Sequence, residues 1–321
     1  MVRFTGYEFP SKNYKMKVAL IIIFNHKYEK NIDLLKRIYG KRFTDIYYIM
    51  PFYSGNVENI IPVYENSYFF QGYIAQAFSR FYREDYDYYY FIGDDLLVNP
   101  SINESNLHEI FKLDGREAFI SQFIQLHKTK YWQWTREAVE YRLKRKGTEL
   151  YNELPSFERA LSKFKLHGLE LGRLKFSQVY RFKLNKWSDE RFSKYVTLPT
   201  WVKHYAIYFI NGNRFSLDYP LCGAYSDTFL VPAYAIKSFS TYCGIFAASE
   251  LYVELAIPTA LILSCDKILT EGDIEWKGKT FWSKIDVDEF LEKYNDINQL
   301  QADFPEKCLY IHPVKLSRWA K

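Results

Sequence analysis

Apolar runs and amphipathic stretches alternate from the start of the chain. Residues 17–24, KVALIIIF, form a continuous apolar run, which is typical of a strand buried on both faces of a parallel sheet. Residues 28–39 carry apolar side chains at helical spacing, and Gly40 follows them as a stop signal. The pattern therefore predicts a buried strand followed by an amphipathic helix.

The same alternation continues through the first hundred residues. It predicts strands at 45–50, 60–63 and 88–92, and a helix over 67–82 with Ser67 as its N-cap. Strands that alternate with helices in this way favour an open, mostly parallel sheet with helices on both faces. We therefore expect a Rossmann-like α/β fold, whose ligands bind beyond the carboxyl ends of the strands.

Polar residues follow two of these strands. The aromatic run that ends at Gly93 is followed by the adjacent carboxylates of Asp94 and Asp95, while Asn25 and His26 follow the first strand. Neighbouring carboxylates repel each other in a dry site and favour a cation beside them, and their oxygens suit Mg²⁺ or Mn²⁺. A strand that ends in a solvated polar turn is the structural alternative.

The middle of the chain differs in character. After a predicted strand at 116–125, residues 127–200 read as a mainly helical, basic insertion. Between 128 and 194 there are 17 Lys and Arg against 8 Asp and Glu, with Trp residues among them and a basic run at 143–146. A solvated basic face, an acceptor-binding lid and contact with an anionic membrane surface are the interpretations. Nucleic acid is not expected, because no nucleic-acid-binding motif appears.

Several further elements follow the insertion. Apolar runs and turn signals divide this part of the chain. In order, the pattern predicts a strand at 201–212, a strand at 228–231, a helix after Pro232, a helix at 249–256 with Ser249 as N-cap and Pro258 as its end, a buried strand at 259–265, and a helix near 287–294.

Composition narrows the class of protein. The 321 residues are 48% hydrophobic and 19% aromatic, enough for a large core, and the net charge of +5 is modest. The four cysteines show no CxxC spacing and indicate reduced, buried thiols. The N-terminal stretch lacks the apolar region of a signal peptide. We expect a cytoplasmic protein, with peripheral binding at the inner membrane face as a further expectation from the basic insertion.

The segment Gly93-Asp94-Asp95 after an aromatic strand resembles the DXD motif of GT-A nucleotide-sugar glycosyltransferases. Gly93 stands where that family usually has the first Asp. The resemblance implies that Asp95 is the main metal ligand and that Asp94 assists it or contacts the nucleotide. It also implies that Phe24, Asn25 and His26 lie against the nucleotide. It covers 17–100 by architecture, and 220–265 and 305–319 by short motifs.

The C-terminal segment carries a second resemblance. Residues 312–319, HPVKLSRW, are similar to the HxxGxxKPW segment of retaining GT-A enzymes, although Lys315 replaces the Gly and the Pro is absent. The resemblance implies that His312 is a third metal ligand and that Lys315 or Arg318 neutralises a leaving diphosphate. A surface histidine in a basic tail is the alternative.

Acidic residues near 250 carry a third resemblance. Many inverting GT-A enzymes place a carboxylate base at the start of a helix below the acceptor, and Glu250 fits that position, with Glu254 as the alternative. Asp227 is a candidate for binding the acceptor hydroxyl. Helix capping and a turn are the structural alternatives for these acids. The His-containing segment suggests a retaining enzyme and the acidic helix an inverting one, so the stereochemistry stays open.

These observations predict a metal-dependent glycosyltransferase. It would move a sugar from a nucleoside diphosphate sugar to a carbohydrate or lipid-linked glycan acceptor, with Mn²⁺ or Mg²⁺, in surface polysaccharide or glycan synthesis. Residues 1–126 would bind the donor, 127–200 form the insertion, and 201–321 bind the acceptor and complete the metal site. The alternatives are a non-catalytic nucleotide-sugar or membrane-surface binding protein, and a GDD-type polymerase or nucleotidyltransferase. No P-loop or GxGxxG motif is present, which argues against P-loop and NAD-binding proteins.

Overall fold

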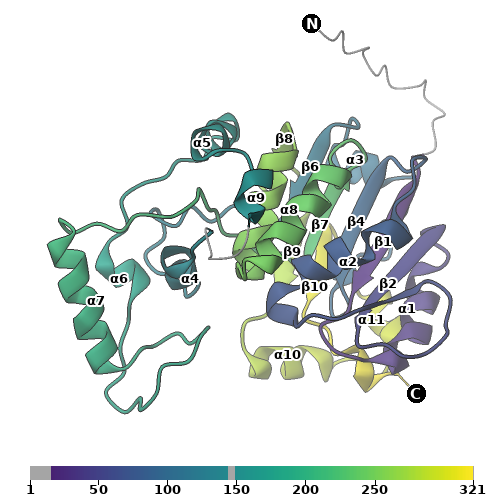
Figure 1. Ribbon diagram of the computed structural model, residues 1–321. Coiled ribbons are helices and arrows are strands. Elements are labelled where there is room, and N and C mark those ends of the chain that lie inside the picture. Colours follow the sequence, from purple (N-terminus) through teal and green to yellow (C-terminus); the bar gives the residue numbers. More distant parts are fainter. Residues whose placement is uncertain (1–15, 144–148, 321) are drawn as a thin grey trace, which may run out of the picture.

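The computed structural model describes residues 16–143 and 149–320 of the chain. A twisted sheet with helices on both faces makes up the larger part, and a lobe of short helices and long loops lies to one side of it (Figure 1). The predicted α/β class, with a mostly parallel central sheet, is confirmed. Part of the predicted basic run at 143–146 lies outside the described residues.

The central sheet has seven strands in the order β3-β2-β1-β4-β7-β6-β8. Neighbouring strands run parallel except for β7, which is antiparallel to both β4 and β6. The sequence pattern located most of these strands but not the reversal of β7. The bounds are β1 (Val18–Ile23), β2 (Asp45–Pro51), β3 (Ile60–Val63), β4 (Tyr88–Gly93), β6 (Glu117–Ile120), β7 (Thr228–Pro232) and β8 (Lys267–Leu269).

The aromatic strand β4 lies at the centre of the core. Its side chains alternate between the two faces of the sheet, so that Tyr89 and Phe91 enter one apolar cluster while Tyr88, Tyr90 and Ile92 enter the other. All five are at most 1% exposed. Burial on both faces explains why the run is continuously apolar and aromatic, without the polar alternation of a half-exposed strand.

Helices cover the sheet on both sides, as predicted. Buried residues of α1 (Ile32–Tyr39), α3 (Leu107–Phe111), α10 (Lys284–Leu291) and α11 (Ile297–Ala302) belong to one cluster. Those of α2 (Gln71–Phe81), α8 (Ile236–Ala248) and, apart from Ile262, α9 (Val253–Ser264) belong to the other. The short helical turn η1 (Glu29–Asn31) precedes α1.

A second, three-stranded sheet joins the C-terminal segment to the acidic motif. Its order is β5-β10-β9, with bounds β5 (Leu97–Val98), β9 (Lys277–Thr280) and β10 (Cys308–His312). Strand β5 begins two residues after Asp95, and β10 is antiparallel to it. This pairing brings His312, at the end of β10, back to the carboxylates that follow β4.

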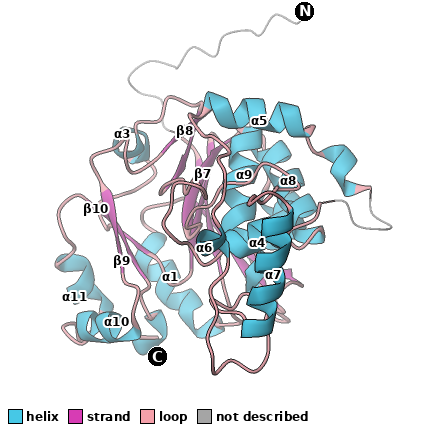
Figure 2. Cartoon of the chain, turned by 90° about the vertical axis from the view of Figure 1, so that its left-hand side faces the viewer, coloured by secondary structure: helices cyan, strands magenta, loops and turns pink. Residues whose placement is uncertain are grey.

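The predicted insertion contains α4 (Thr135–Glu140), α5 (Phe157–Leu166) and α6 (Phe176–Val179), joined by long loops. The expectation of a mainly helical segment was wrong, because irregular structure connects these short helices. Gly168, with φ of 68°, follows the last turn of α5 and ends this helix. Figure 2 looks onto the outer side of this lobe.

The predicted strand at 201–212 is instead a helix, α7 (Leu198–Ile210), which lies with α4 and α6 in the lobe (Figures 1 and 2). Thr197 caps it, since its side chain accepts a hydrogen bond from the Thr200 N–H at 3.4 Å, and Pro199 occupies its first turn. Periodicity could not separate the two structures, because the run is apolar on every side.

The predicted helix at 249–256 and strand at 259–265 are wrong as well. Residues 253–264 form the single helix α9, while Ser249 caps the C-terminus of α8. Pro258 lies inside α9 and cannot donate to the carbonyl of Glu254, four residues earlier. The Ala224 N–H donates to that carbonyl instead, at 3.0 Å, so the helix passes the proline with its freed acceptor satisfied.

Candidate functional site

The candidate site lies at the edge of the sheet where β1 and β4 end. Because β7 is antiparallel to β4, its first residues reach this same edge, and Thr228 pairs with Ile92. The Gly93 N–H donates to the carbonyl of Asp227 at 2.8 Å, and the Asp94 N–H donates to the carbonyl of Ile23 at 2.9 Å. Backbone hydrogen bonds thus hold the acidic motif between the ends of β1 and β7.

Asp95, Asp227 and His312 come together from three separate parts of the chain. The Nε2 atom of His312 lies 3.5 Å from Oδ1 of Asp95 and 3.7 Å from Oδ1 of Asp227. Two hydrogen bonds hold the backbone here: the Val314 N–H donates to the carbonyl of Asp95 at 2.6 Å, and the Phe281 N–H donates to that of His312 at 2.8 Å. The side chain of His312 is 17% exposed, and those of the two acids are one-third exposed.

The glycine in the acidic motif has a steric role. A Cβ atom at Gly93 would lie 3.1 Å from Oδ1 of Asp95, which is tighter than ordinary van der Waals contact. The Asp95 side chain therefore lies close to the backbone of Gly93. A first Asp, as in a DXD motif, would require this carboxylate to move.

The charges of these groups depend on one another. Burial lowers the pKa of His312, but the charges of Asp227 and Asp95 raise it more strongly, to about 9. Burial raises the pKa of Asp227, His312 lowers it, and Asp95 raises it again. At neutral pH His312 is therefore an imidazolium ion that forms ion pairs with the two aspartates.

Glu254, in the first turn of α9, belongs to the same electrostatic group. Burial, followed by the charge of Asp227, raises its pKa to about 9, although a hydrogen bond with Trp134 and the charge of His312 lower it. Its buried Oε2 atom has no hydrogen-bond partner within residues 16–143 and 149–320. Glu254 is thus a half-buried residue whose carboxyl group is protonated at neutral pH, has one buried and unpaired oxygen, and interacts electrostatically with Asp227 and His312.

Asp94 differs from its neighbour Asp95 in its surroundings. It is only 6% exposed, and its Oδ1 accepts a hydrogen bond from the Asn25 N–H at 3.3 Å. Burial and then the charge of Asp95 raise its pKa to about 7, while hydrogen bonds from the Asn25 backbone and the buried Asn31 side chain lower it. Asp94 therefore points into the protein and ties the ends of β1 and β4 together, whereas Asp95 faces the site.

A cleft of about 620 Å³ opens beside Asp227. Tyr225 and Trp282 form an aromatic wall, with their ring centroids 4.6 Å apart, and the Trp282 side chain is 69% exposed. Tyr310 and Glu271 also line the cleft, and the Tyr310 hydroxyl donates to Glu271 at 2.8 Å. A cleft lined by both aromatic and polar side chains suits a flat or ring-shaped polar ligand such as a sugar.

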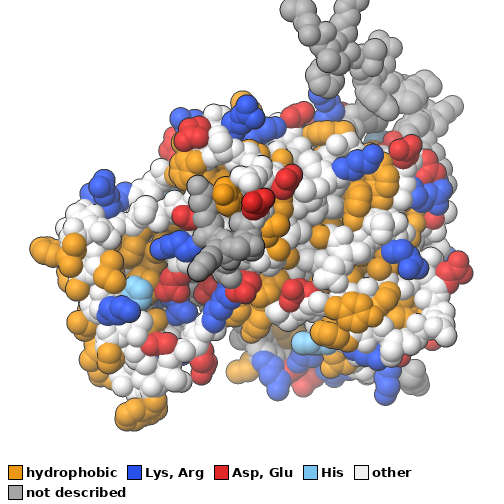
Figure 3. Space-filling view, viewed as in Figure 1, with side chains coloured by type: hydrophobic (Ala, Val, Ile, Leu, Met, Phe, Trp, Pro, Cys, Tyr) orange, Lys and Arg blue, Asp and Glu red, His pale blue; other side chains and the backbone are white. Residues whose placement is uncertain are grey.

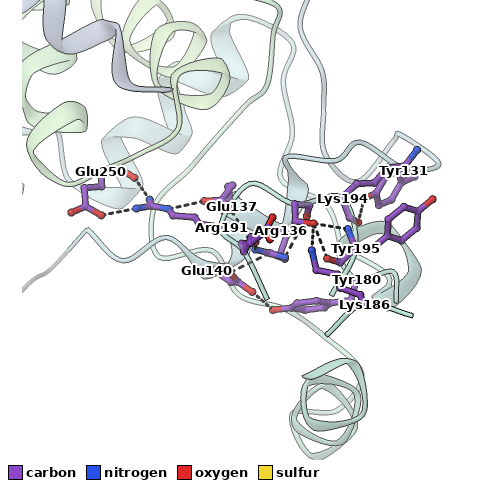
Figure 4. A network of polar contacts seen from close by, with 12 residues as sticks. Tyr131, Arg136, Glu137, Glu140, Tyr180, Lys186, Arg191, Lys194, Tyr195 and Glu250 are labelled. Carbon is purple, nitrogen blue, oxygen red and sulfur yellow. Dashed lines mark hydrogen bonds and ion pairs between the residues drawn. The ribbon is translucent and has the colours of Figure 1, made fainter. Parts of the chain in front are cut away.

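Glu250 does not reach this group. It lies in the turn between α8 and α9, with φ of 56°, and its Oε2 forms an ion pair with Nη1 of Arg191 at 2.7 Å. Arg191 also donates to the Glu250 carbonyl at 2.7 Å and contacts the buried Glu137 at 3.4 Å (Figure 4). Glu250 thus belongs to a polar network that links the lobe to the helical layer. The helix start that the sequence assigned to it belongs to Glu254.

Other predicted site residues also lie apart from the carboxylates. Lys315 forms an ion pair with Asp288 at 2.9 Å and, like Arg318, is exposed. Phe24 is fully buried, with its ring centroid 6.3 Å from that of Tyr48, so its side chain belongs to the core. His26 is exposed near Tyr28, with their ring centroids 6.2 Å apart. Among the residues predicted to contact the nucleotide, Asp94 belongs to the acidic motif itself, and Asn25 contacts it through the hydrogen bond from its N–H.

Sequence reasoning missed four residues of this region. Asn31 interacts with Asp94, and Trp134 interacts with Glu254. The other two, Trp282 and Tyr310, line the cleft. Asn31 could have been noticed as a polar residue just before the first apolar position of a predicted amphipathic helix. Strand β9, KGKT, lacks apolar alternation, so nothing in the sequence placed Trp282, which follows it, near the site.

The residues of the site fit a divalent cation by their chemistry. Asp95 and Asp227 offer oxygen ligands and His312 a nitrogen ligand, and the buried Oδ1 of Asp95 accepts no hydrogen bond from the described residues. In the described residues, however, no group of three or more His, Cys, Asp and Glu side chains is arranged to hold a metal ion. The present arrangement is that of an ion pair, in which Nε2 of His312 faces the two carboxylates.

No protein-family model matches the chain, and no curated protein matches it either. Across the described residues, no helix combines the length and the apolar character needed to cross a bilayer.

Proposed function

We propose that the protein is a metal-dependent glycosyltransferase of the GT-A kind, which transfers a sugar from a nucleoside diphosphate sugar to a hydroxyl acceptor. The observation that carries the proposal is the convergence of Asp95, Asp227, His312 and Glu254 at the carboxyl edge of a parallel sheet, beside an aromatic cleft. Nucleotide ligands of such sheets bind at this edge.

The donor would lie along the ends of β1 and β4. Asp95, with Asp227 and His312, would hold Mn²⁺ or Mg²⁺, which supplies positive charge to the leaving diphosphate when bound. Asp94 and Asn31 would act indirectly, since they fix the backbone of Asn25 and the acidic turn. Lys315 and Arg318 lie outside this arrangement, so the role first expected of them, neutralising the diphosphate, falls to the cation.

The acceptor would enter through the cleft beside Asp227. Tyr225 and Trp282 would stack against a sugar ring, and Asp227 would orient the reacting hydroxyl group. We therefore propose a carbohydrate or glycan acceptor. The volume of about 620 Å³ is in the range of small-molecule sites.

Glu254 is the best-placed base in this chain. A general base needs a pKa near the working pH and a position beside the reacting hydroxyl. The pKa of about 9 is too high in the protein alone, but added positive charge near Asp227 stabilises the ionised carboxylate and lowers this pKa. This role for Glu254 favours an inverting reaction, in which the base removes the proton of the acceptor.

Nucleotide binding and turnover together test the proposal. Calorimetry with nucleoside diphosphates, with and without Mn²⁺, should show metal-dependent binding that Asp95→Asn abolishes, because this substitution removes a charge and keeps the shape. Glu254→Gln should keep that binding, but its rates of nucleotide-sugar hydrolysis and of sugar transfer should fall by 100-fold or more, the usual size of a general-base contribution.

A matched control lies four residues away. Glu250→Gln removes a carboxylate that pairs with Arg191, so it should leave binding and turnover near the wild-type level. Full turnover in Asp95→Asn would overturn the metal site. Metal-dependent binding without turnover of any common nucleotide sugar would instead favour a non-catalytic binding protein.

A further inference from the structure

Helix α7 has an unusual surface. Its sequence, LPTWVKHYAIYFI, contains one lysine and one histidine among otherwise uncharged, mainly apolar residues. The structure describes every residue of this helix, and none of them is buried. Ile210 is 80% exposed and Phe209 66%. A helix that is apolar all round normally lies inside a protein or a membrane, so this one lacks a cover that its sequence favours.

One side of α7 is attached to the lobe through aromatic contacts. The ring centroids of Trp201 and Tyr205 each lie 5.1 Å from that of Phe176, in α6, and His204 stacks on Tyr180 at 4.4 Å. These residues recur at the helical spacing of one face. The remaining apolar residues, on the rest of the helix surface, are Leu198, Val202, Ala206, Ile207, Phe209 and Ile210.

A neighbouring loop extends this apolar surface. Trp187 is 94% exposed and Leu184 79%. The loop is fixed to the start of α7, because Asp189 accepts hydrogen bonds at 2.6 Å from both the Thr197 N–H and the Thr200 hydroxyl. Figure 3 shows hydrophobic side chains gathered along this outer edge of the lobe. Exposed apolar groups that cluster in this way indicate an interaction surface.

Positive charge surrounds the apolar groups. Residues 181–214 contain seven Lys and Arg and two Asp and Glu. Of the two acids, Asp189 is engaged in capping α7. Lys183, Lys203 and Arg214 are exposed, and within the described part of the chain no ion pair engages them. The surface therefore combines apolar anchors with cations that can meet a negatively charged partner.

From this combination we propose that α7 and the loop at 183–189 form a docking surface for an anionic lipid bilayer. The 13 residues of α7 extend about 20 Å, too short to cross a membrane but suited to lying in its interface. An exposed Trp beside Lys and Arg is typical of interfacial anchors. A second copy of this chain would bring like charges together across the contact. This inference does not depend on the proposed transferase activity.

Vesicle co-sedimentation of the full chain tests the proposal. The protein should bind vesicles that contain phosphatidylglycerol and not those of phosphatidylcholine alone, and added salt should weaken the binding. The double substitution Phe209→Ser/Ile210→Ser should reduce partitioning about tenfold or more, because it removes two apolar side chains. Lys183→Glu/Lys203→Glu should also reduce it about tenfold or more, by reversing two charges.

Ile285→Ser is the matched control. Ile285 is an exposed apolar residue, 68% accessible, at the start of α10 and outside the proposed surface, so its substitution should leave vesicle binding unchanged. Circular dichroism should show that all variants fold, since the substituted side chains are exposed. Quenching of Trp fluorescence by brominated lipid should fall in Trp187→Phe if the loop enters the interface.

Several outcomes would overturn the proposal. One is wild-type binding that shows no preference for anionic vesicles, or that is unaffected by both double substitutions. A wild-type dimer in light scattering that Phe209→Ser/Ile210→Ser dissociates would assign the surface to a second copy. Retention on DNA without retention on vesicles would assign it to nucleic acid.

Discussion

Glu254, whose Oε2 atom is buried, predicts an unusual effect of a site substitution on stability. Its ordinary pKa of 4.5 rises to about 9 in the folded protein, chiefly through burial. Between these two values the unfolded chain has lost this proton while the folded protein keeps it. Folding stability therefore decreases as the pH rises through this window, by up to about 1.4 kcal/mol per pH unit from this group alone.

Glu254→Gln removes this cost. Glutamine has nearly the shape of the protonated acid and does not ionise in the unfolded chain. At pH 7 we expect the free energy of unfolding of the variant to exceed that of the wild type by about 1–3 kcal/mol. This range lies below the value that the whole pKa shift would give, because the neighbouring charges readjust. Its stability should also depend less on pH between 5 and 9. The proposed function predicts that the same substitution lowers turnover by 100-fold or more, so that Glu254 would provide activity at the expense of stability.

Urea unfolding at a series of pH values, followed by circular dichroism, measures both effects. Glu250→Gln is the internal comparison: it breaks a half-exposed ion pair with Arg191, so it should lower stability by less than about 1 kcal/mol. The two substitutions, four residues apart, should thus change the free energy of unfolding in opposite directions. A Glu254→Gln variant that is less stable than the wild type at pH 7, with the same pH slope, would refute the reasoning.

Three further substitutions separate binding from folding. Gly93→Ala places a Cβ 3.1 Å from Oδ1 of Asp95, so we expect weaker Mn²⁺ binding in calorimetry while the circular dichroism spectrum is retained. Arg191→Met removes one of the two arginines that pair with the buried Glu137, the other being Arg136 at 3.9 Å, and should lower the unfolding free energy by about 2 kcal/mol in urea; an unchanged midpoint would contradict this. Trp282→Ala alters an exposed wall of the cleft and should raise the acceptor KM without changing the melting temperature, whereas a large loss of stability would contradict its assignment to the surface.

Local patterns predicted β1 and β4 well because these strands are buried on both faces of the central sheet. The apolar run of β1 and the aromatic run of β4 are short and continuous, as expected of buried strands, and the acid pair follows β4 directly. The acidic part of the candidate site, at the end of β4, could therefore be located from sequence. The direction of β7 could not, since a short apolar run looks the same whichever way it crosses the sheet.

The other half of the site depends on contacts between distant residues. The pattern divided α9 at Pro258 because a proline usually ends a helix, and only the hydrogen bond from Ala224 to Glu254 explains why the helix continues. That division moved the predicted helix start to Ser249 and made Glu250 the leading base. His312 was predicted from a motif, but its position beside Asp95 follows from the pairing of β10 with β5.

The charges at the site connect its stability to its proposed ligand. Asp95, Asp227 and Glu254 carry more negative charge, when ionised, than the imidazolium of His312 can balance, and the raised pKa values of Asp227 and Glu254 express this excess. A divalent cation bound among them, with His312 neutral as a ligand, would supply two positive charges in place of one and favour the ionised form of Glu254. Mn²⁺ should therefore raise the melting temperature of the wild type and release protons on binding. In Glu254→Gln the stabilisation should remain while the proton release decreases to that of His312, which must lose its proton to bind the ion, because Glu254 no longer contributes a proton.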